Sequence, residues 1–309
     1  MSIDLRTQLQ GSLGPGYRLS RELGGGGMAH VFVADDPELD RSVVVKVLSP
    51  DLTVGVDGER FKREIQVATS LNHPRIVPVE SAASAGDVLY YTMPFIDGDT
   101  LRALVTAEKR IPVERAIAIA RDVTEALVHA HSRNIVHRDI KPDNVLIERA
   151  SGRALVTDFG IARAIERAAD LVSVTTTGLT LGTPTYMSPE QAAAERHIDG
   201  RSDVYSLGCV LYELLAGLPP FSGPTARAVI ARHMTEPPPK IRAVRPDVPI
   251  ALEATINRML AKAPAGRFSA AELLDALDGK PVPEPSVRSA GKRSALRDTA
   301  ASFLRKLRP

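Results

Sequence analysis

The chain has 309 residues, of which 44% are apolar and 25% charged, enough for one large domain or two modest ones with a substantial core. Only 4% of the residues are aromatic, and the single cysteine, Cys209, excludes a disulfide within the chain and indicates a reducing, cytoplasmic location. The net charge of +2 hides an asymmetry, because residues 281–309 carry +5 and the preceding 280 residues carry −3, so the body of the chain is not expected to bind nucleic acid.

Residues 1–16 form an N-terminal extension that lacks the apolar segment of a signal peptide. No run of about 18 apolar residues occurs anywhere in the chain. We therefore expect no membrane-spanning helix.

Two short strands, Tyr17–Leu19 and Val31–Val33, are predicted to flank a run of four glycines at 24–27. Glycine adopts conformations that other residues avoid, so this hairpin indicates a backbone that approaches a ligand closely. Taken alone, the run fits a flexible hairpin equally well. The next strand, Val43–Leu48, is apolar except for Lys46. A lysine in a buried strand is costly unless it is paired, and the alternative is an edge lysine that reaches solvent.

A helix over residues 59–68 offers two candidate partners for Lys46, Glu59 and Glu64. Glu64 is favoured because it lies next to Ile65, which belongs to the apolar stripe of this helix. Glu59 lies in the first turn, where a solvated carboxylate is favourable.

Strands around Ile76–Val79 and Val88–Met93 and a long amphipathic core helix over Pro112–His131 are predicted next. The stretch Ile135–Ile147, IVHRDIKPDNVLI, then places six polar residues between two apolar runs. Apolar runs would not flank a surface loop, and a core strand would not carry so many polar groups. We therefore predict a catalytic loop pinned between two short buried strands.

A strand over Ala154–Thr157 ends in Asp158-Phe159-Gly160, and a threonine-rich segment at 161–187 leads to Ser188-Pro189-Glu190. Asp203 then opens a strongly apolar helix that extends to Leu215, where an aspartate is a favourable cap. Loops and two short helices follow and end near residue 277.

These features, in this order, resemble the eukaryotic-type (Hanks-type) serine/threonine protein kinases over roughly residues 17–278, and the stretches GGGGMAHVFVA and YYTMPFIDG look like bacterial members. The resemblance implies an α+β, bilobal protein kinase fold. Its N-lobe, at 17–96, is expected to be a small antiparallel β-sheet plus a helix, and its C-lobe, at 97–278, to be larger and mostly α-helical. Residues 279–309 are expected to form a Pro-rich linker and a basic amphipathic tail.

The resemblance implies a serine/threonine protein kinase in signal transduction that uses ATP with Mg²⁺, or alternatively Mn²⁺, to phosphorylate protein substrates. Asp139 is expected to accept the proton of the attacking hydroxyl, and Lys141 to place its ammonium on the transferring phosphoryl group. Asn144 and Asp158 are expected to ligate the metal.

Lys46 is expected to grip the α- and β-phosphates while Glu64 holds it in place. Ala29 stands where the family's third loop glycine is expected, and Pro94 replaces the usual acidic hinge residue but keeps the carbonyl that the hinge uses. The expected ATP-binding residues are Leu23, Gly24, Gly25, Gly26, Gly27, Met28, Ala29, His30, Val31, Val44, Lys46, Glu64, the gatekeeper Met93, Pro94 and Ile96.

The threonine-rich segment resembles an activation loop, whose phosphate Arg138 would bind. Phe159 and Gly160 would let the preceding aspartate switch. Autophosphorylation is expected among Thr175, Thr176, Thr177 and Thr180. Structural roles are expected for Thr183 against the catalytic loop, for an ion pair between Glu190 and Arg267, and for Asp203 as a brace of the catalytic-loop backbone.

The alternative function is a pseudokinase that acts as a nucleotide-binding scaffold, although such proteins usually lack at least one of the five residues Lys46, Glu64, Asp139, Asn144 and Asp158. A small-molecule kinase fits the threonine-rich segment poorly. Residues 290–309 leave three alternatives: a disordered or loosely docked tail, a basic amphipathic helix that touches a membrane or a partner, or the start of a further region.

Overall fold

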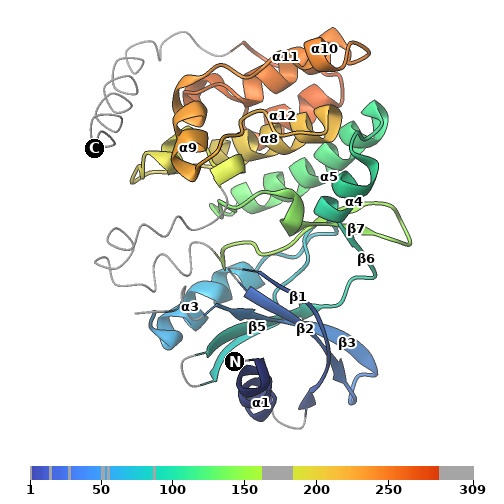
Figure 1. Ribbon diagram of the computed structural model, residues 1–309, viewed down its shortest axis with the longest axis vertical. Helices are drawn as coiled ribbons and strands as arrows, with labels where there is room; N and C mark the ends of the chain where they lie inside the picture. The colour runs from blue at the N-terminus through green and yellow to red at the C-terminus, as the bar shows by residue number, and fades with distance from the viewer. Residues whose placement is uncertain are drawn as a thin grey trace. The chain divides into compact units, whose positions relative to one another are not determined.

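The structure is a computed structural model that describes residues 2–13, 16–26, 29–49, 53, 56–85, 88–161 and 184–284 (Figure 1). Its contacts divide the chain into two compact units. The first comprises Met1–Asp97 with Thr157–Gly182, and the second comprises Gly98–Val156 with Thr183–Pro309.

An antiparallel five-stranded sheet forms the first unit, in the order β1-β2-β3-β5-β4. The strands are β1 (Arg18–Gly26), β2 (Ala29–Asp36), β3 (Arg41–Leu48), β4 (Ser81–Ala85) and β5 (Val88–Pro94). Two helices accompany the sheet, α1 (Ser2–Leu13) and α3 (Gly58–Thr69). The antiparallel sheet and α3 confirm what the resemblance implied, whereas α1 is a helix that was not predicted.

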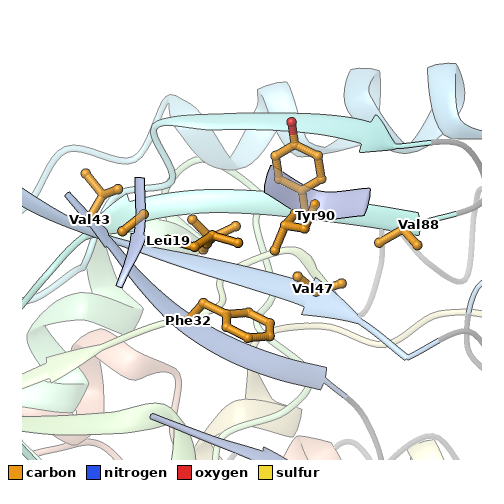
Figure 2. Close-up of a cluster of buried hydrophobic side chains, with 9 residues drawn as sticks. Leu19, Phe32, Val43, Val47, Val88 and Tyr90 are labelled. Atoms are coloured by element: carbon orange, nitrogen blue, oxygen red, sulfur yellow. The ribbon is translucent and has the colours of Figure 1, made fainter. Parts of the chain in front are cut away.

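One face of this sheet is packed against α1. Figure 2 shows apolar side chains on that face, among them Phe32, Val47 and Tyr90. Because side chains alternate along a strand, Val43, Val45 and Val47 of β3 all point to this face. Leu9 of α1 is completely buried there, and Leu5 lies one turn before it against the same cluster. The N-terminal extension therefore completes the core of the first unit.

The sequence predicted a strand around Ile76–Val79, and this prediction is wrong. These residues form an irregular segment, and the strand lies later in the chain, at β4. Ile76 and Val79 are buried, and Ile76 makes only an isolated β-bridge, so their apolar pattern reflects packing and not membership of a strand. Pro78 lies between them and has no N–H to donate to a neighbouring strand.

The second unit is mostly helical, and α5 (Val113–His131) and α8 (Arg201–Ala216) contact each other within it. It also contains a small sheet of β6 (Gly98–Thr100), β7 (Val145–Glu148) and β8 (Ala154–Val156). The remaining helices are α4 (Leu101–Glu108), α7 (Pro189–Ala192), α9 (Ala226–Thr235), α10 (Ile241–Val244), α11 (Ile250–Met259) and α12 (Ala270–Leu277).

Cys209 lies fully buried in α8, as predicted, and burial raises the pKa of its thiol. None of the helices in the described ranges combines the length and apolarity needed to cross a bilayer.

Candidate active site

Lys46 and Asp158, both in the first unit, form an ion pair through Nζ and Oδ2. Lys46 lies on the face of β3 opposite to Val45 and Val47, because side chains alternate along the strand. The sequence predicted Glu64 of α3 as the partner of Lys46. Glu64 is half-buried, and its pairing with Lys46 stays a prediction, whereas the ion pair present in this structure is with Asp158.

Asp158 also accepts a hydrogen bond from the hydroxyl of Tyr91 at 2.6 Å. The Asp158 backbone has φ of 66°, a left-handed conformation that is uncommon for a residue other than glycine. Phe159 is buried, and Gly160 has φ of 75°, which explains the glycine there. The segment after β8 thus turns sharply at the carboxylate predicted to bind metal.

The glycine-rich hairpin is formed by β1 and β2, whose register pairs Gly24 with Val31, Gly25 with His30 and Gly26 with Ala29. Leu23, before the glycines, is exposed, whereas Ala29 is buried. The predicted loop residues Gly27 and Met28 lie outside the described residues.

At the end of the sheet, Met93 of β5 lies opposite Val44 of β3, and both side chains are buried. Pro94 ends β5 opposite Val43, and the amide of the next residue, Phe95, donates to the carbonyl of Ser42 at 3.3 Å. Ile96 follows in the irregular segment, half-buried. The predicted gatekeeper Met93 and hinge residue Pro94 thus form the end of the strand that carries Tyr91.

The predicted catalytic loop lies in the second unit, but only one of its two flanking strands forms. β7 follows the loop as predicted. Ile135 before the loop is buried but is not in a strand, because its amide bonds to the carbonyl of Ala130 at the end of α5. Asn134, with φ of 58°, turns the chain at that helix end.

Asp203 braces the loop, as predicted. Its carboxylate accepts the backbone amides of His137 at 2.9 Å and Arg138 at 2.8 Å, and it contacts His131 Nε2 at 2.8 Å. Burial alone would raise the pKa of Asp203, but the contacts with His131 and His137 hold that pKa below its usual value. The capping role is not seen, because Gly200 occupies the N-cap of α8 and no side chain caps it.

The carboxylate of Asp139 is fixed by two neighbours in the same loop. Lys141 Nζ contacts Asp139 Oδ2 at 2.7 Å, and Asn144 Nδ2 donates to the same oxygen at 3.0 Å and to the Asp139 carbonyl at 2.8 Å. The Asp139 side chain remains about one-third exposed, so an incoming hydroxyl could reach it. The loop therefore presents an oriented carboxylate beside an ammonium, an arrangement suited to accepting a proton near negative charge.

Glu190 and Arg267 form a buried bidentate ion pair, with distances of 2.6 and 2.8 Å. Next to Glu190, Gln191 donates from Nε2 to the carbonyl of Arg138 at 2.7 Å. The structure thus places Arg138 in the braced loop, whereas its expected partners Thr175, Thr176, Thr177 and Thr180, and likewise Thr183, lie outside the described residues.

Sequence reasoning missed three residues that contact the predicted ones: Tyr91, His131 and Gln191. The structure explains the glycine at 200, because a Cβ there would meet the His131 ring at 2.4 Å, but the sequence alone does not reveal this approach. The other two are ordinary residues of a strand and a helix, and nothing in the local pattern distinguishes them.

No group of three or more His, Cys, Asp or Glu residues that could hold a metal occurs within the described part of the chain. Mg²⁺ does not require one, since it commonly binds one or two protein oxygens together with nucleotide phosphates and water. Asp158 offers a carboxylate, and Asn144, whose nitrogen is used within the loop, would offer its Oδ1. Each of these donors, taken by itself, is of the kind that Mg²⁺ bound with a nucleotide accepts.

Three kinds of comparison bear on this geometry. The protein kinase domain family matches residues 17–277. The serine/threonine-protein kinase PknB of Mycobacterium leprae is 42% identical over 295 residues, which are 92% of this chain and 47% of that protein. The serine/threonine-protein kinase PrkC of Bacillus subtilis is 40% identical over 263 residues, 84% of this chain and 39% of that protein.

Among solved structures, that of Rad53 1-466 in complex with AMP-PNP matches with a TM-score of 0.70 and 26% identity, and the match covers 84% of this chain and 64% of that chain. The chain spans less than half the length of each of these two curated relatives.

Proposed function

This chain belongs to the protein kinase domain family, and from that membership we infer that it transfers the γ-phosphoryl group of ATP to serine or threonine hydroxyls of proteins. The observation that carries the proposal is the geometry around Asp139, whose carboxylate is fixed by Lys141 and Asn144 in a loop braced by Asp203. The relatives named above are serine/threonine-protein kinases, and one matching structure is a complex with AMP-PNP.

In the proposed reaction, the substrate hydroxyl oxygen forms a bond to the γ-phosphorus while the bond from that phosphorus to the bridging oxygen breaks, releasing ADP. Asp139 takes up the hydroxyl proton, and the Lys141 ammonium offsets charge on the transferring group. Mg²⁺, held by Asp158 and Asn144, would neutralise the phosphate charge. Lys46 would exchange its contact with Asp158 for the α- and β-phosphates.

The remaining assignments extend this proposal. We propose that residues 17–278 form the kinase domain and that the protein is located in the cytoplasm. We also propose that the expected nucleotide contacts, from the glycine-rich hairpin to Ile96, form the ATP site. We also propose that Thr175, Thr176, Thr177 or Thr180 becomes autophosphorylated and that Arg138 binds the phosphate. Mass spectrometry of protein incubated with ATP should find phosphate in that segment.

The decisive test is transfer of label from γ-labelled ATP to a generic protein substrate by wild type and Asp139→Asn. The amide cannot take up a proton as the carboxylate does, so we expect a loss of about 10²–10⁴-fold in rate. Asp143→Asn is the matched control, because Asp143 lies in the same loop with an exposed side chain. Among the ion pairs of the described residues, it forms one with Arg102 of α4, at 3.5 Å. Equal rates for wild type and Asp139→Asn would remove Asp139 from this role, and an inactive wild type that still binds ATP would favour the pseudokinase.

A further inference from the structure

Tyr91 lies on β5, in the interior of the five-stranded sheet, between Tyr90 and Thr92. Only 1% of its surface is exposed, and its hydroxyl donates to Asp158 Oδ1 at 2.6 Å. A buried phenol normally requires a hydrogen-bond partner, because leaving its hydroxyl unsatisfied would be costly. Here the partner is the carboxylate predicted to ligate the metal.

The strand register places Tyr91 directly opposite Lys46, on β5 and β3 respectively. Opposed residues of antiparallel strands project to the same face with their Cβ atoms about 5 Å apart. Lys46 contacts Asp158 Oδ2, whereas Tyr91 contacts Oδ1. Two adjacent side chains of one rigid sheet therefore hold the two oxygens of a single carboxylate.

These two donors differ in what they can do when a nucleotide binds. The long Lys46 side chain can move to the phosphates, whereas the phenol of Tyr91 is rigid, buried and confined to the sheet interior. A metal-ligating carboxylate uses one oxygen for the metal and commonly accepts an outer hydrogen bond on the other, and that outer bond fixes its orientation. Tyr91 is suited to keep this second oxygen in place throughout the reaction.

We propose that Tyr91 is a positioning residue for the metal, whose hydroxyl orients the Asp158 carboxylate toward Mg²⁺ bound with the nucleotide. This inference rests on the proposed function, since it assigns Asp158 to the metal. It concerns the coupling between metal and nucleotide, so it can be tested by binding alone.

The experiment measures the affinity for ADP by isothermal titration calorimetry, once with saturating Mg²⁺ and once in EDTA. The dissociation constant for ADP in EDTA, divided by the dissociation constant in Mg²⁺, reports how strongly metal and nucleotide binding are coupled. In Tyr91→Phe the carboxylate loses its orienting donor, so we expect this ratio to fall about 10-fold relative to wild type, the lower end of what loss of an outer hydrogen bond costs. The affinity in EDTA should stay within about twofold of wild type, because the phenyl ring preserves the packing.

Tyr90→Phe is the matched control. Tyr90 is the preceding residue of the same strand, points to the opposite face into the cluster of Figure 2, and shares a hydrogen bond with Ser12 Oγ at 3.1 Å. Removing the Tyr90 hydroxyl should leave the ratio of the ADP dissociation constants in EDTA and in Mg²⁺ unchanged.

An unchanged ratio in Tyr91→Phe overturns the inference, as does an equal fall in Tyr90→Phe. A fall in ADP affinity that is as large in EDTA as in Mg²⁺ also overturns it, because that would be a structural effect. Should Tyr91→Phe not fold, Tyr91→Leu fills the core without a donor and carries the same expectation. A wild type that binds no ADP in either condition would overturn the proposed function itself, which separates the two failures.

Discussion

At the scale of single residues, His233 of α9 shows how burial alters a titrating group. Its ring is fully buried, shares a hydrogen bond with Tyr205 at 2.9 Å and meets the Phe221 ring edge-on at 4.8 Å. Burial, followed by the nearby charge of Lys262, lowers the pKa of His233 to about 3. Lys262 itself lies over the Phe221 ring at 4.1 Å, and burial lowers its pKa to about 8.

This lowered pKa predicts a pH-dependent loss of stability. In the unfolded chain His233 takes up a proton below about pH 6.5, whereas in the folded chain it stays neutral down to about pH 3. The unfolded state therefore binds more protons between these values, and the free energy of unfolding should fall by up to about 1.4 kcal/mol per pH unit as the pH drops through this window. Above pH 6.5, His233 should not contribute to the pH dependence of the free energy of unfolding.

Urea unfolding of wild type and His233→Gln at several pH values measures this contribution. Carboxylates also make the free energy of unfolding depend on pH, but they do so equally in both proteins, so the difference between the two slopes belongs to His233. His197→Gln, at an exposed histidine, is the control and should retain the wild-type slope. Identical slopes for wild type and His233→Gln would contradict the prediction.

At the scale of elements, α1 is an integral part of the sheet's core. Besides the burial of Leu9, Gln10 Nε2 donates to the Tyr17 carbonyl at 2.8 Å, and the Leu19 amide donates to Gln10 Oε1 at 2.8 Å. Arg6 donates to the carbonyls of Leu19 and Ser20. These bonds tie the helix to the start of β1.

Leu9→Ala should therefore destabilise the protein by about 2–5 kcal/mol, since it removes buried surface and leaves a cavity. Leu39→Ala is the control, because Leu39 lies 64% exposed in the turn between β2 and β3 and should change stability by less than about 0.5 kcal/mol. Urea unfolding gives both values, and a similarly small effect for the two variants would mean that α1 does not stabilise the sheet.

The elements also show what sequence can predict. The sheet and the core helices follow from local patterns, and Lys46 breaks an apolar strand in a recognisable way. The roles of Asp139 and Asp158, in contrast, were predicted from the resemblance to the kinase family. The prediction of a strand at 76–79 failed because Ile76 and Val79 are buried there although only Ile76 makes an isolated β-bridge. Contacts such as those of Tyr91 or Gln191 depend on distant partners, so no periodicity along the chain reveals them.

At the scale of the whole molecule, the charge of the kinase-like body differs from that of the tail. The body carries −3, whereas residues 281–309 carry +5. The sequence of the tail predicts a helix with Leu296, Phe303 and Leu307 on one stripe, and residues 285–309 lie outside the described ones. A basic amphipathic segment binds anionic lipid surfaces through charge and apolar burial. We propose that residues 290–309 make such a contact or bind a partner of similar chemistry.

The chain should therefore float with anionic vesicles, and a version that ends at residue 289 should not. Binding should weaken as salt rises, because the screening length falls to about 10 Å at 0.1 M. Vesicles without anionic lipid are the control. Equal flotation of both versions would exclude the tail as the binding segment, and flotation of neither would leave a protein partner as the target.

The packing of α1 has a practical meaning for anyone who trims the chain. The family match begins at residue 17, after the whole of α1. Recombinant protein started there would present Val43, Val45 and Val47 to water as an adhesive apolar surface, which invites aggregation. Expression boundaries drawn from homology alone would thus discard the piece that keeps this lobe soluble.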